Sequence, residues 1–336
     1  MRMLSIHNIW TISRYEVKTL LRSWFFRIFA GLVLIFLTFF NIVFFAQAFE
    51  HMPWGFRGIP SSMPYFNMML LNVAQAVIAI FLASDFLKRD RKSNTTEVIY
   101  MRSMSNADYI IGKTIGLLTV FLGLNVLMLL ISAIMQIVFT DLALQPLVYL
   151  YYRLLVSIPT LIFVFGLAFL AMTLLRNQAV TFILLLGYFA VSLIVLNFRF
   201  AETFDAVAFF LPLSYSDFVG FSNMHFLLMQ RLAYLALGLG FIFLSILFFK
   251  RLPQSKTMQT LSAVLMILFL AAGVVLLTTY FMHDLSGYML RKDMIALNDQ
   301  YAEEPVVAVN SYDLVFEQHD HHFVVNANLS VRNETN

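Results

Sequence analysis

The chain has 336 residues, of which 60% are hydrophobic and only 12% are charged. Because soluble domains carry about 25% charged residues, this composition excludes a soluble globular protein and indicates an integral membrane protein. The net charge of +3 is small, and the absence of cysteine excludes disulfides, thiol catalysis and cysteine metal sites.

Residues 1–24 are too polar to span a bilayer. One face of a helix in this segment would be apolar, with Ile6, Ile9, Trp10, Val17, Leu20, Leu21 and Trp24. The opposite face would be polar or basic, with His7, Thr11, Arg14, Lys18 and Arg22. This pattern predicts an amphipathic helix in the cytoplasmic membrane interface, with its basic residues facing anionic lipid. A plain cytoplasmic extension of the first span is the alternative interpretation.

Seven stretches are apolar enough, and at about 20 residues or more long enough, to cross a membrane. They are Phe25–Phe49, Tyr65–Ala83, Thr114–Phe139, Leu147–Leu175, Ala179–Leu196, Phe226–Phe249 and Met258–Met282. If the N-terminus is inside, about two thirds of the 22 lysines and arginines lie in segments that face the cytoplasm. This distribution follows the positive-inside rule, so we expect a cytoplasmic N-terminus and an exported, acidic C-terminal tail.

The segment 84–113, between the second and third predicted spans, is rich in charge. It ends in Ala107, Gly112, Lys113 and Thr114, which match the loose A-x-x-x-x-G-K-T form of a nucleotide-binding P-loop. A P-loop needs a buried strand before it and a soluble helix after it, so that backbone N–H groups can hold phosphates. Here no strand pattern precedes the match and a membrane span follows it, so we expect no ATP site.

The same segment contains start signals for two helices. Asn94 and Glu97 form a capping-box pattern that predicts a short helix over about 95–102. Ser105 and Asp108 predict the start of a second helix, which continues into the third span. The short helix presents apolar side chains on the cytoplasmic side, which favours a docking surface. A solvated connection between two spans is the alternative.

These features together resemble the permease subunit of type-2 ABC exporters, over roughly residues 5–250. The family's loop between the second and third spans carries an acid, a basic cluster, a threonine–glutamate pair and a glycine–lysine pair. The corresponding residues here are Asp85, Lys88–Lys92, Thr96-Glu97 and Gly112-Lys113, and the family's elbow residues correspond to Glu16 and Arg22-Ser23. The chain departs from the family where a glycine is replaced by Asn94 or Thr95, and a proline by Met104 or Ser105.

The resemblance implies an all-α polytopic protein of the bacterial inner membrane. Its parts would be an interfacial elbow helix (1–24), a six-helix permease core (25–250) with its coupling loop (84–113), a seventh span (251–283) and a short β-rich exported tail (284–336). A separate ABC ATPase subunit would carry ATP and Mg, and a second permease copy, identical or different, would complete the path. The ATPase would push on a coupling helix through Asn94, Thr96, Glu97, Val98, Ile99, Met101 and Arg102. No catalytic motif, cofactor, metal or nucleic-acid partner is expected for this chain.

The spans carry no Asp, Glu, Lys or His at the expected mid-membrane depth, which argues against coupling to protons or sodium. Small and amide residues instead share one face of the second span, namely Asn72, Gln75, Ala76 and Ala79. Such a face suits close helix packing, or else the lining of a path or of a dimer interface.

The outside loop Asn197–His225 is too long for a simple hairpin and contains an apolar run. In the family that it resembles, this place holds short re-entrant helices that close the outer mouth. Phe209, Phe210, Leu211 and Pro212 would then form an apolar outer gate. An interfacial loop anchored by its aromatic residues is the alternative.

The exported tail shows the period of β-strands rather than of helices. Apolar side chains alternate around Leu314, Phe316, Phe323 and Val325, and a turn is expected near 318–321. An isolated hairpin is marginal in water, so we expect it to begin a larger domain. It is similar to the start of the β-sandwich that opens zinc aminopeptidase-like domains fused behind such permeases in some bacteria.

Two functions remain open from the sequence. The first is a permease subunit that couples ATP hydrolysis by a separate subunit to export; lipid, peptide, drug and polysaccharide-precursor substrates are all compatible with its apolar walls. The alternative is a membrane anchor or mechanotransmission module that tethers a periplasmic, peptidase-like domain without transport.

Overall fold

The computed structural model of the protein describes residues 4–45, 59–85, 104–140, 142–197, 200, 202–216, 220–249, 256–302, 308–319 and 322–332. Its α-helices are α1 (Ile6–Arg22), α2 (Trp24–Phe45), α4 (Ser62–Ser84), α7 (Asn106–Phe139), α8 (Pro146–Tyr152), α9 (Ile158–Leu175), α10 (Gln178–Val191), α12 (Met224–Phe248) and α13 (Lys256–Tyr301). Two π-helical turns are η1 (Arg153–Ser157) and η2 (Ser192–Leu196). The strands are β1 (Tyr215–Ser216), β2 (Gly220–Phe221), β3 (Ala308–His319) and β4 (His322–Arg332).

Within these described residues, seven helical stretches are long and apolar enough to cross a membrane. They correspond one to one to the seven predicted spans, with α8, η1 and α9 forming a single stretch, Pro146–Leu175. The protein is therefore mostly helical, as a multi-pass membrane protein should be. Two helices extend beyond the predicted spans: α7 begins at Asn106, at the helix start expected from Ser105, and the last helix continues past Met282 to Tyr301.

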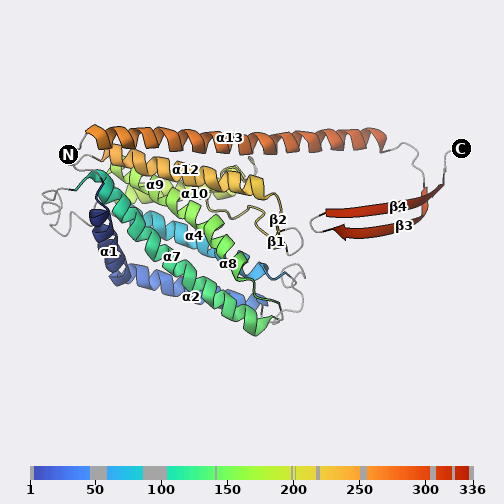
Figure 1. Ribbon diagram of the computed structural model, residues 1–336, viewed down its shortest axis with the longest axis horizontal. Coiled ribbons are helices and arrows are strands. Elements are labelled where there is room, and N and C mark those ends of the chain that lie inside the picture. Colours follow the sequence, from blue (N-terminus) through green and yellow to red (C-terminus); the bar gives the residue numbers. More distant parts are fainter. Residues whose placement is uncertain are drawn as a thin grey trace.

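The spans pack side by side with α9 at the centre of the bundle (Figure 1). α9 contacts α12, α4, α10 and α7, and α13 lies along the outside of α12. The helices α2, α10 and α13 expose most of their apolar surface. Lipid tails are the solvent that such a surface requires.

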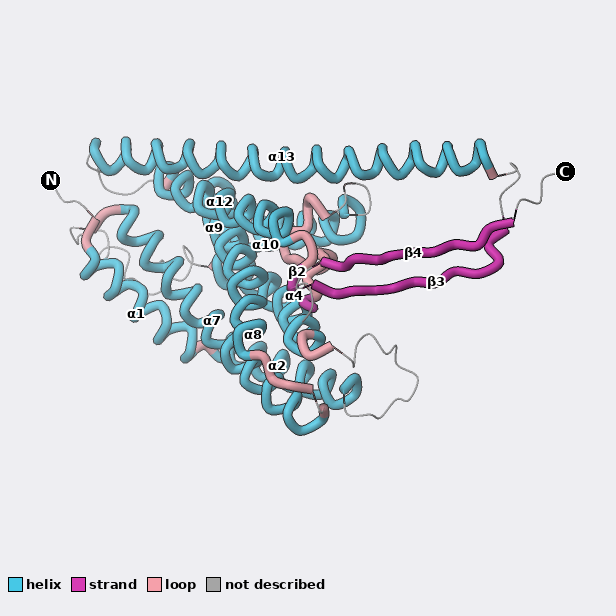
Figure 2. The backbone as a smooth tube through the Cα atoms, turned by 45° about the vertical axis from the view of Figure 1, so that its right-hand side comes forward, coloured by secondary structure: helices cyan, strands magenta, loops and turns pink. Residues whose placement is uncertain are grey.

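α1 is a separate helix that packs along the first half of α7 (Figure 2). Ser5 caps its start through a side-chain bond from Asn8 N, and extended backbone at Ser23 divides it from α2. The two helices approach closely at Gly112 and Gly116, where an added Cβ would lie 2.8 Å from Ile12 Cβ and 2.7 Å from Glu16 Cβ. The predicted amphipathic helix is thus confirmed as a helix, and its side away from α7 leaves Ile6 and Trp10 exposed.

We call the end of the bundle at which α1 packs the inner end, and the opposite end the outer end, after the predicted orientation. At the inner end, α7 begins with the capping box expected from the sequence. Ser105 Oγ accepts from Asp108 N, and the Asp108 carboxylate accepts from Ser105 N, each at 3.0 Å. The structure confirms this helix start.

The C-terminal part differs from the expected β-rich tail beginning at residue 284. α13 continues as helix to Tyr301, and only then do β3 and β4 form an antiparallel hairpin. Phe316 pairs with Val325 and Leu314 with Ala327, so the predicted strand alternation is confirmed. The helix continues because residues 284–301 contain no proline and many good helix formers; the next proline is Pro305.

Candidate functional site

The inner end of α7 is held to α1 by buried polar contacts. Lys113 Nζ lies 3.2 Å from Glu16 Oε2, and both side chains are at least 95% buried. The Lys113 ammonium also lies 5.2 Å from the centre of the Tyr109 ring. One turn earlier, the Asp108 carboxylate accepts a hydrogen bond from Ser5 N (3.0 Å). These contacts make α1 and the start of α7 one packed unit.

The P-loop-like residues lie inside this unit. Ala107, Gly112, Lys113 and Thr114 are all part of the regular helix α7. The Lys113 ammonium faces Glu16, and Gly112 packs against α1. Helical N–H groups bonded along the helix cannot surround a phosphate, so the motif serves helix packing here.

The predicted coupling residues, from Asn94 to Arg102, lie outside the described residues. The two ends of their loop are described: α4 ends at Ser84 and α7 starts at Asn106. The start of α7 also contacts the end of α12, because Asn106 Nδ2 donates to Phe249 O (2.6 Å). The loop therefore connects α4 with α7, and α7 in turn contacts α1 and α12.

A buried polar network joins α4, α7 and η1 in the middle of the bundle. Asn125 Nδ2 donates to Gln75 Oε1 (2.8 Å), and Gln75 Nε2 donates to Ser157 Oγ (3.1 Å). Ser157 Oγ in turn donates to Asn125 Oδ1, which closes a ring of three side chains. All three are fully buried. Ser157 ends the π-helical turn η1, a type of turn that is frequent at functional sites.

Residues 202–213, here called the outer segment, fold back into the outer end of the bundle and bond to this network. Gln75 Nε2 donates to Asn72 Oδ1 (2.7 Å). Asn72 Nδ2 then donates to Thr160 Oγ1 (3.0 Å) and to the backbone carbonyl of Val207. Thr160 Oγ1 donates to Ala206 O (2.7 Å). A continuous set of hydrogen bonds thus connects α7 with the outer segment.

The residues predicted on one face of the second span lie in the interior. Asn72, Gln75 and Ala79 have no exposed surface, and Ala76 is 3% exposed. In this conformation they face neither an open path nor a surface that a second copy could cover. These residues are closely packed between helices, which is one of the two roles that the sequence left open.

Three polar side chains within about one turn of α12 also hold the backbone of the outer segment. Their bonds are Arg231 Nη2 to Asp205 O (2.6 Å), Gln230 Nε2 to Glu202 O (2.9 Å) and Tyr234 OH to Thr203 O (2.8 Å). Arg231 is 1% exposed, and its guanidinium lies 5.3 Å from the centre of the Tyr234 ring. A buried cation is costly unless it is hydrogen-bonded, so the carbonyls of the outer segment stabilise Arg231 as much as Arg231 fixes them.

Asp205 closes the outer segment on itself. Its Oδ2 accepts a hydrogen bond from Phe210 N (2.7 Å), whereas its Oδ1 is buried without a partner among the described residues. Burial raises the pKa of the Asp205 carboxyl, while the charge of Arg231 and the N–H groups of the segment oppose this shift. The carboxyl therefore keeps its proton to a higher pH than a solvated aspartate does.

The predicted gate residues lie at the tip of the outer segment. Leu211 is 2% exposed, Phe209 is half-buried, and Phe210 and Pro212 are exposed. The Phe209 and Phe210 rings meet edge to face, 4.9 Å between centres. Just beyond them, Tyr152 OH donates to Leu213 O (2.7 Å). The segment is thus held at both ends, and its apolar tip is only partly covered.

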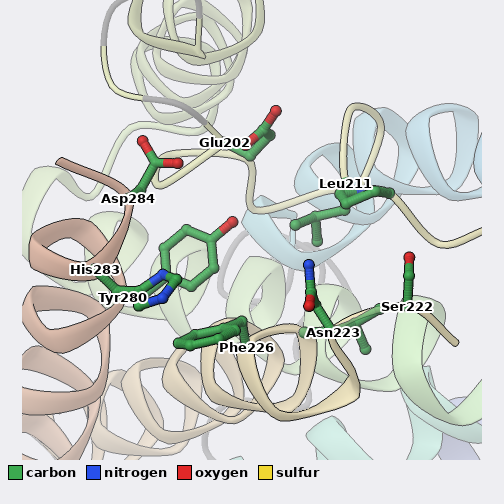
Figure 3. Close-up of a pocket in the computed structure, with 10 residues that line it drawn as sticks. Glu202, Leu211, Ser222, Asn223, Phe226, Tyr280, His283 and Asp284 are labelled. Atoms are coloured by element: carbon green, nitrogen blue, oxygen red, sulfur yellow. The ribbon is translucent and has the colours of Figure 1, made fainter. Parts of the chain in front are cut away.

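A small cavity of about 160 Å³ lies between the outer segment, the start of α12 and α13 (Figure 3). Glu202, Tyr280 and Asp284 line it, and the His283 ring stacks on Phe226 at 3.6 Å. Burial raises the pKa of the Glu202 carboxyl, the like charges of Asp284 and Asp205 add to this, and Arg291 opposes it. Within the described part of the chain, no group of three or more His, Asp or Glu residues could hold a metal ion.

The sequence pattern did not predict the four residues that anchor the outer segment, namely Asp205, Gln230, Arg231 and Tyr234. The signal was a set of polar residues in or beside an apolar span, where each polar group needs a partner. The partners of Gln230, Arg231 and Tyr234 are backbone carbonyls, and that of Asp205 is the backbone N–H of Phe210; any residue supplies such groups. The pattern of side chains along the sequence therefore cannot predict which backbone groups these side chains bind.

The chain was also compared with known proteins. No model of a known protein family and no characterised protein matches it.

Proposed function

We propose that the chain is the permease subunit of an ATP-driven ABC exporter in the bacterial inner membrane. A separate ATPase subunit would supply the hydrolysis, and a second permease copy would complete the path. The observation that carries this proposal is the packed unit of α1 and α7, which Lys113 and Glu16 join close to the start of α7. In the family that the chain resembles, the ATPase pushes on the coupling helix, so a span that starts just after the coupling loop and is fixed to the elbow helix would move with it.

The polar network offers a route from that unit to the outer segment. Lys113 and Asn125 lie on the same helix, about 18 Å apart along its axis at 1.5 Å per residue. A shift of α7 along α4 would strain the Asn125–Gln75 bond, and Asn72 would carry that strain to the Val207 carbonyl. Packed interfaces of this kind switch between discrete arrangements rather than bending continuously. Export would require the outer segment, with Phe209 to Pro212 at its tip, to leave its present position.

The anchor function is the second candidate, and α13 favours it. This helix has 46 residues, so it is about 69 Å long, more than twice the roughly 30 Å hydrocarbon thickness of a bilayer. Its continuation beyond Asp284 ends next to the exposed β3–β4 hairpin (Figure 1). A rigid extension of this kind suits a tether for a domain held away from the membrane surface.

Co-purification tests the ATPase partnership. The variant Glu97→Arg/Val98→Asp changes the predicted coupling helix, and Glu317→Arg/Val315→Asp makes matched changes in the exposed hairpin. We expect the wild type and the hairpin variant, solubilised from the native host, to retain an ABC ATPase that the loop variant loses. An ATPase absent from the wild type, or retained equally by both variants, would refute the partnership.

Cysteine labelling separates export from anchoring, because the chain contains no cysteine. The buried Leu211→Cys should react slowly with a maleimide at rest, and faster when ATP turns over in the complex. Phe210→Cys, which is already exposed, serves as the matched control and should react at the same rate in both states. An unchanged rate at Leu211→Cys in a complex that hydrolyses ATP would favour the anchor.

A further inference from the structure

A cavity of about 490 Å³ lies where α1, α2 and α4 meet at the inner end of the bundle. Its volume is in the range of about 300–1,000 Å³ that small-molecule sites occupy. One wall is polar and comes from α1; the other is apolar and comes from α2 and α4. None of the contacts described for the polar network or the outer segment involves this cavity.

The polar wall carries positive charge. Tyr15, Lys18 and Arg22 are three and four residues apart on α1, so they share one helix face. In the described part of the chain, neither cation forms an ion pair. Asp85 also lines the cavity. The two cations complement an anionic group such as a phosphodiester.

The apolar wall continues into the outer face of the first span. The Phe25 and Phe81 rings lie 4.4 Å apart, and Phe81 also contacts the Phe182 ring. Beyond Phe25, α2 exposes Ile28 and Leu32, which are 44% and 62% exposed. A molecule in this cavity would therefore have its polar group on α1 and an apolar part along α2.

The cavity also lies at the depth of lipid headgroups. α1 ends at Arg22 and the first apolar span begins at Trp24, so the cations lie at the boundary between water and hydrocarbon. Tryptophan and basic side chains are enriched at this boundary. Phospholipid is the abundant molecule there that combines a phosphate with apolar chains.

We propose that this cavity binds one membrane phospholipid. Lys18 and Arg22 contact its phosphate, the Tyr15 hydroxyl borders the headgroup, and its acyl chains run over Phe25 and along α2. A free phosphate ion shares only the first of these contacts. The site depends neither on transport nor on an ATPase partner.

The test compares two variants that remove the same charges. Lys18→Gln/Arg22→Gln changes the cavity, whereas Arg176→Gln/Lys256→Gln changes exposed cations that lie outside the cavity and outside α1. Native mass spectrometry of protein released from nanodiscs should show one phospholipid retained by the wild type and the control but lost from the cavity variant. With about 1 kcal/mol for each basic residue, affinity should fall about thirtyfold. Equal retention by both variants would overturn the proposal.

Two further arms identify the ligand. A short-chain phosphatidylglycerol should raise the Tm of the wild type and of Arg176→Gln/Lys256→Gln, but not of Lys18→Gln/Arg22→Gln. Phe25→Gln leaves the charges intact and should also weaken lipid retention, because the acyl chains lose their wall. Inorganic phosphate should cause no shift; a shift as large as that of the lipid would refute a phospholipid and indicate a free-anion site.

Discussion

Lys113 and Glu16 are 97 positions apart in the sequence and form a buried ion pair between α1 and α7. Glu16 belongs to a helix that is otherwise amphipathic, and Lys113 to a run that matches a nucleotide-binding motif. Each charge is tolerated away from water because the other lies within 3.2 Å. The helical backbone around Lys113 and its ion pair with Glu16 together make Lys113 a packing residue rather than a phosphate ligand.

Removing one partner should destabilise the protein more than removing both. Lys113→Met removes the buried cation that lies 3.2 Å from the Glu16 carboxylate and should cost about 3–5 kcal/mol. The double variant Glu16→Leu/Lys113→Met removes both charges and should lie close to the wild type. Thermal unfolding in detergent measures the difference, with the exposed Lys256→Met as the control. A single variant as stable as the wild type would show that the pair is not buried.

The raised pKa of the Glu202 carboxyl should make the stability of the protein depend on pH. Its folded pKa lies above the ordinary 4.5, through burial and then the like charges of Asp284 and Asp205. Its stabilising contribution is therefore complete below about pH 4.5 and is lost as pH rises through the folded pKa. The free energy of unfolding of the wild type, minus that of Glu202→Gln, should show this loss when both are measured as a function of pH.

Asp284→Asn provides the internal check on that assignment. Without the like charge, the pKa of Glu202 should fall, so the loss of stability should occur at lower pH. The same difference measurement, repeated in the Asp284→Asn background, reports the shift. If the two profiles coincide, Asp284 does not act on Glu202.

At the scale of elements, glycines set how closely the central helices approach. A Cβ added at Gly238 of α12 would lie 2.6 Å from the Phe163 backbone of α9, and one added at Gly166 would contact the Gly238 carbonyl. A Cβ at Gly240 would lie 2.6 Å from Leu270 of α13. Small residues allow such close packing in membranes, where no hydrophobic effect drives helices together.

A methyl group at this crossing should be costly. Gly238→Ala would force α9 and α12 apart, because the obstructing atoms are backbone, and overpacking costs about 1–3 kcal/mol or more. Gly123→Ala, at a helical glycine with open space around it, should be neutral or slightly stabilising. Thermal unfolding of the two variants tests this. Equal stability would mean that the helices are not in contact at Gly238.

At the scale of the whole molecule, the two ends of the bundle differ in character. The inner end is a packed unit of helix starts and ends around Asp108 and Lys113, whereas the outer end is filled by the outer segment and prolonged by α13. The hairpin beyond α13 exposes an apolar face that includes Tyr312, Leu314 and Phe316. A two-stranded sheet of this kind is marginal by itself in water.

Single cysteines test the predicted orientation, because no native cysteine competes for label. His7→Cys should react with a membrane-impermeant maleimide only after the cells are permeabilised. Ser330→Cys in β4 should react once the outer membrane is opened, with the inner membrane intact. The reverse pattern would contradict the positive-inside assignment. Labelling of both sites while the inner membrane is intact would place them on the same side and would contradict an odd number of spans.

Several features of this protein could be predicted from local sequence. A membrane span needs only a long apolar run, a helix start needs a cap such as Ser105 with Asp108, and a strand pair needs alternation such as that around Phe316. All three are determined by neighbours in the chain, and the structure confirms them. The end of α13 was misjudged because loss of apolar character was taken as loss of helix, although helix formation needs no apolar residues.

The tertiary structure alone decided which polar groups meet. The pairing of Lys113 with Glu16, of Asn125 with Gln75 and of Arg231 with carbonyls of the outer segment depends on how whole helices pack. Helix packing follows from glycine contacts and side-chain shape, and neither spacing nor composition records which distant residues it brings together. For the same reason Asn72 and Gln75 could be identified as polar residues on one face, but only the fold placed that face in the interior.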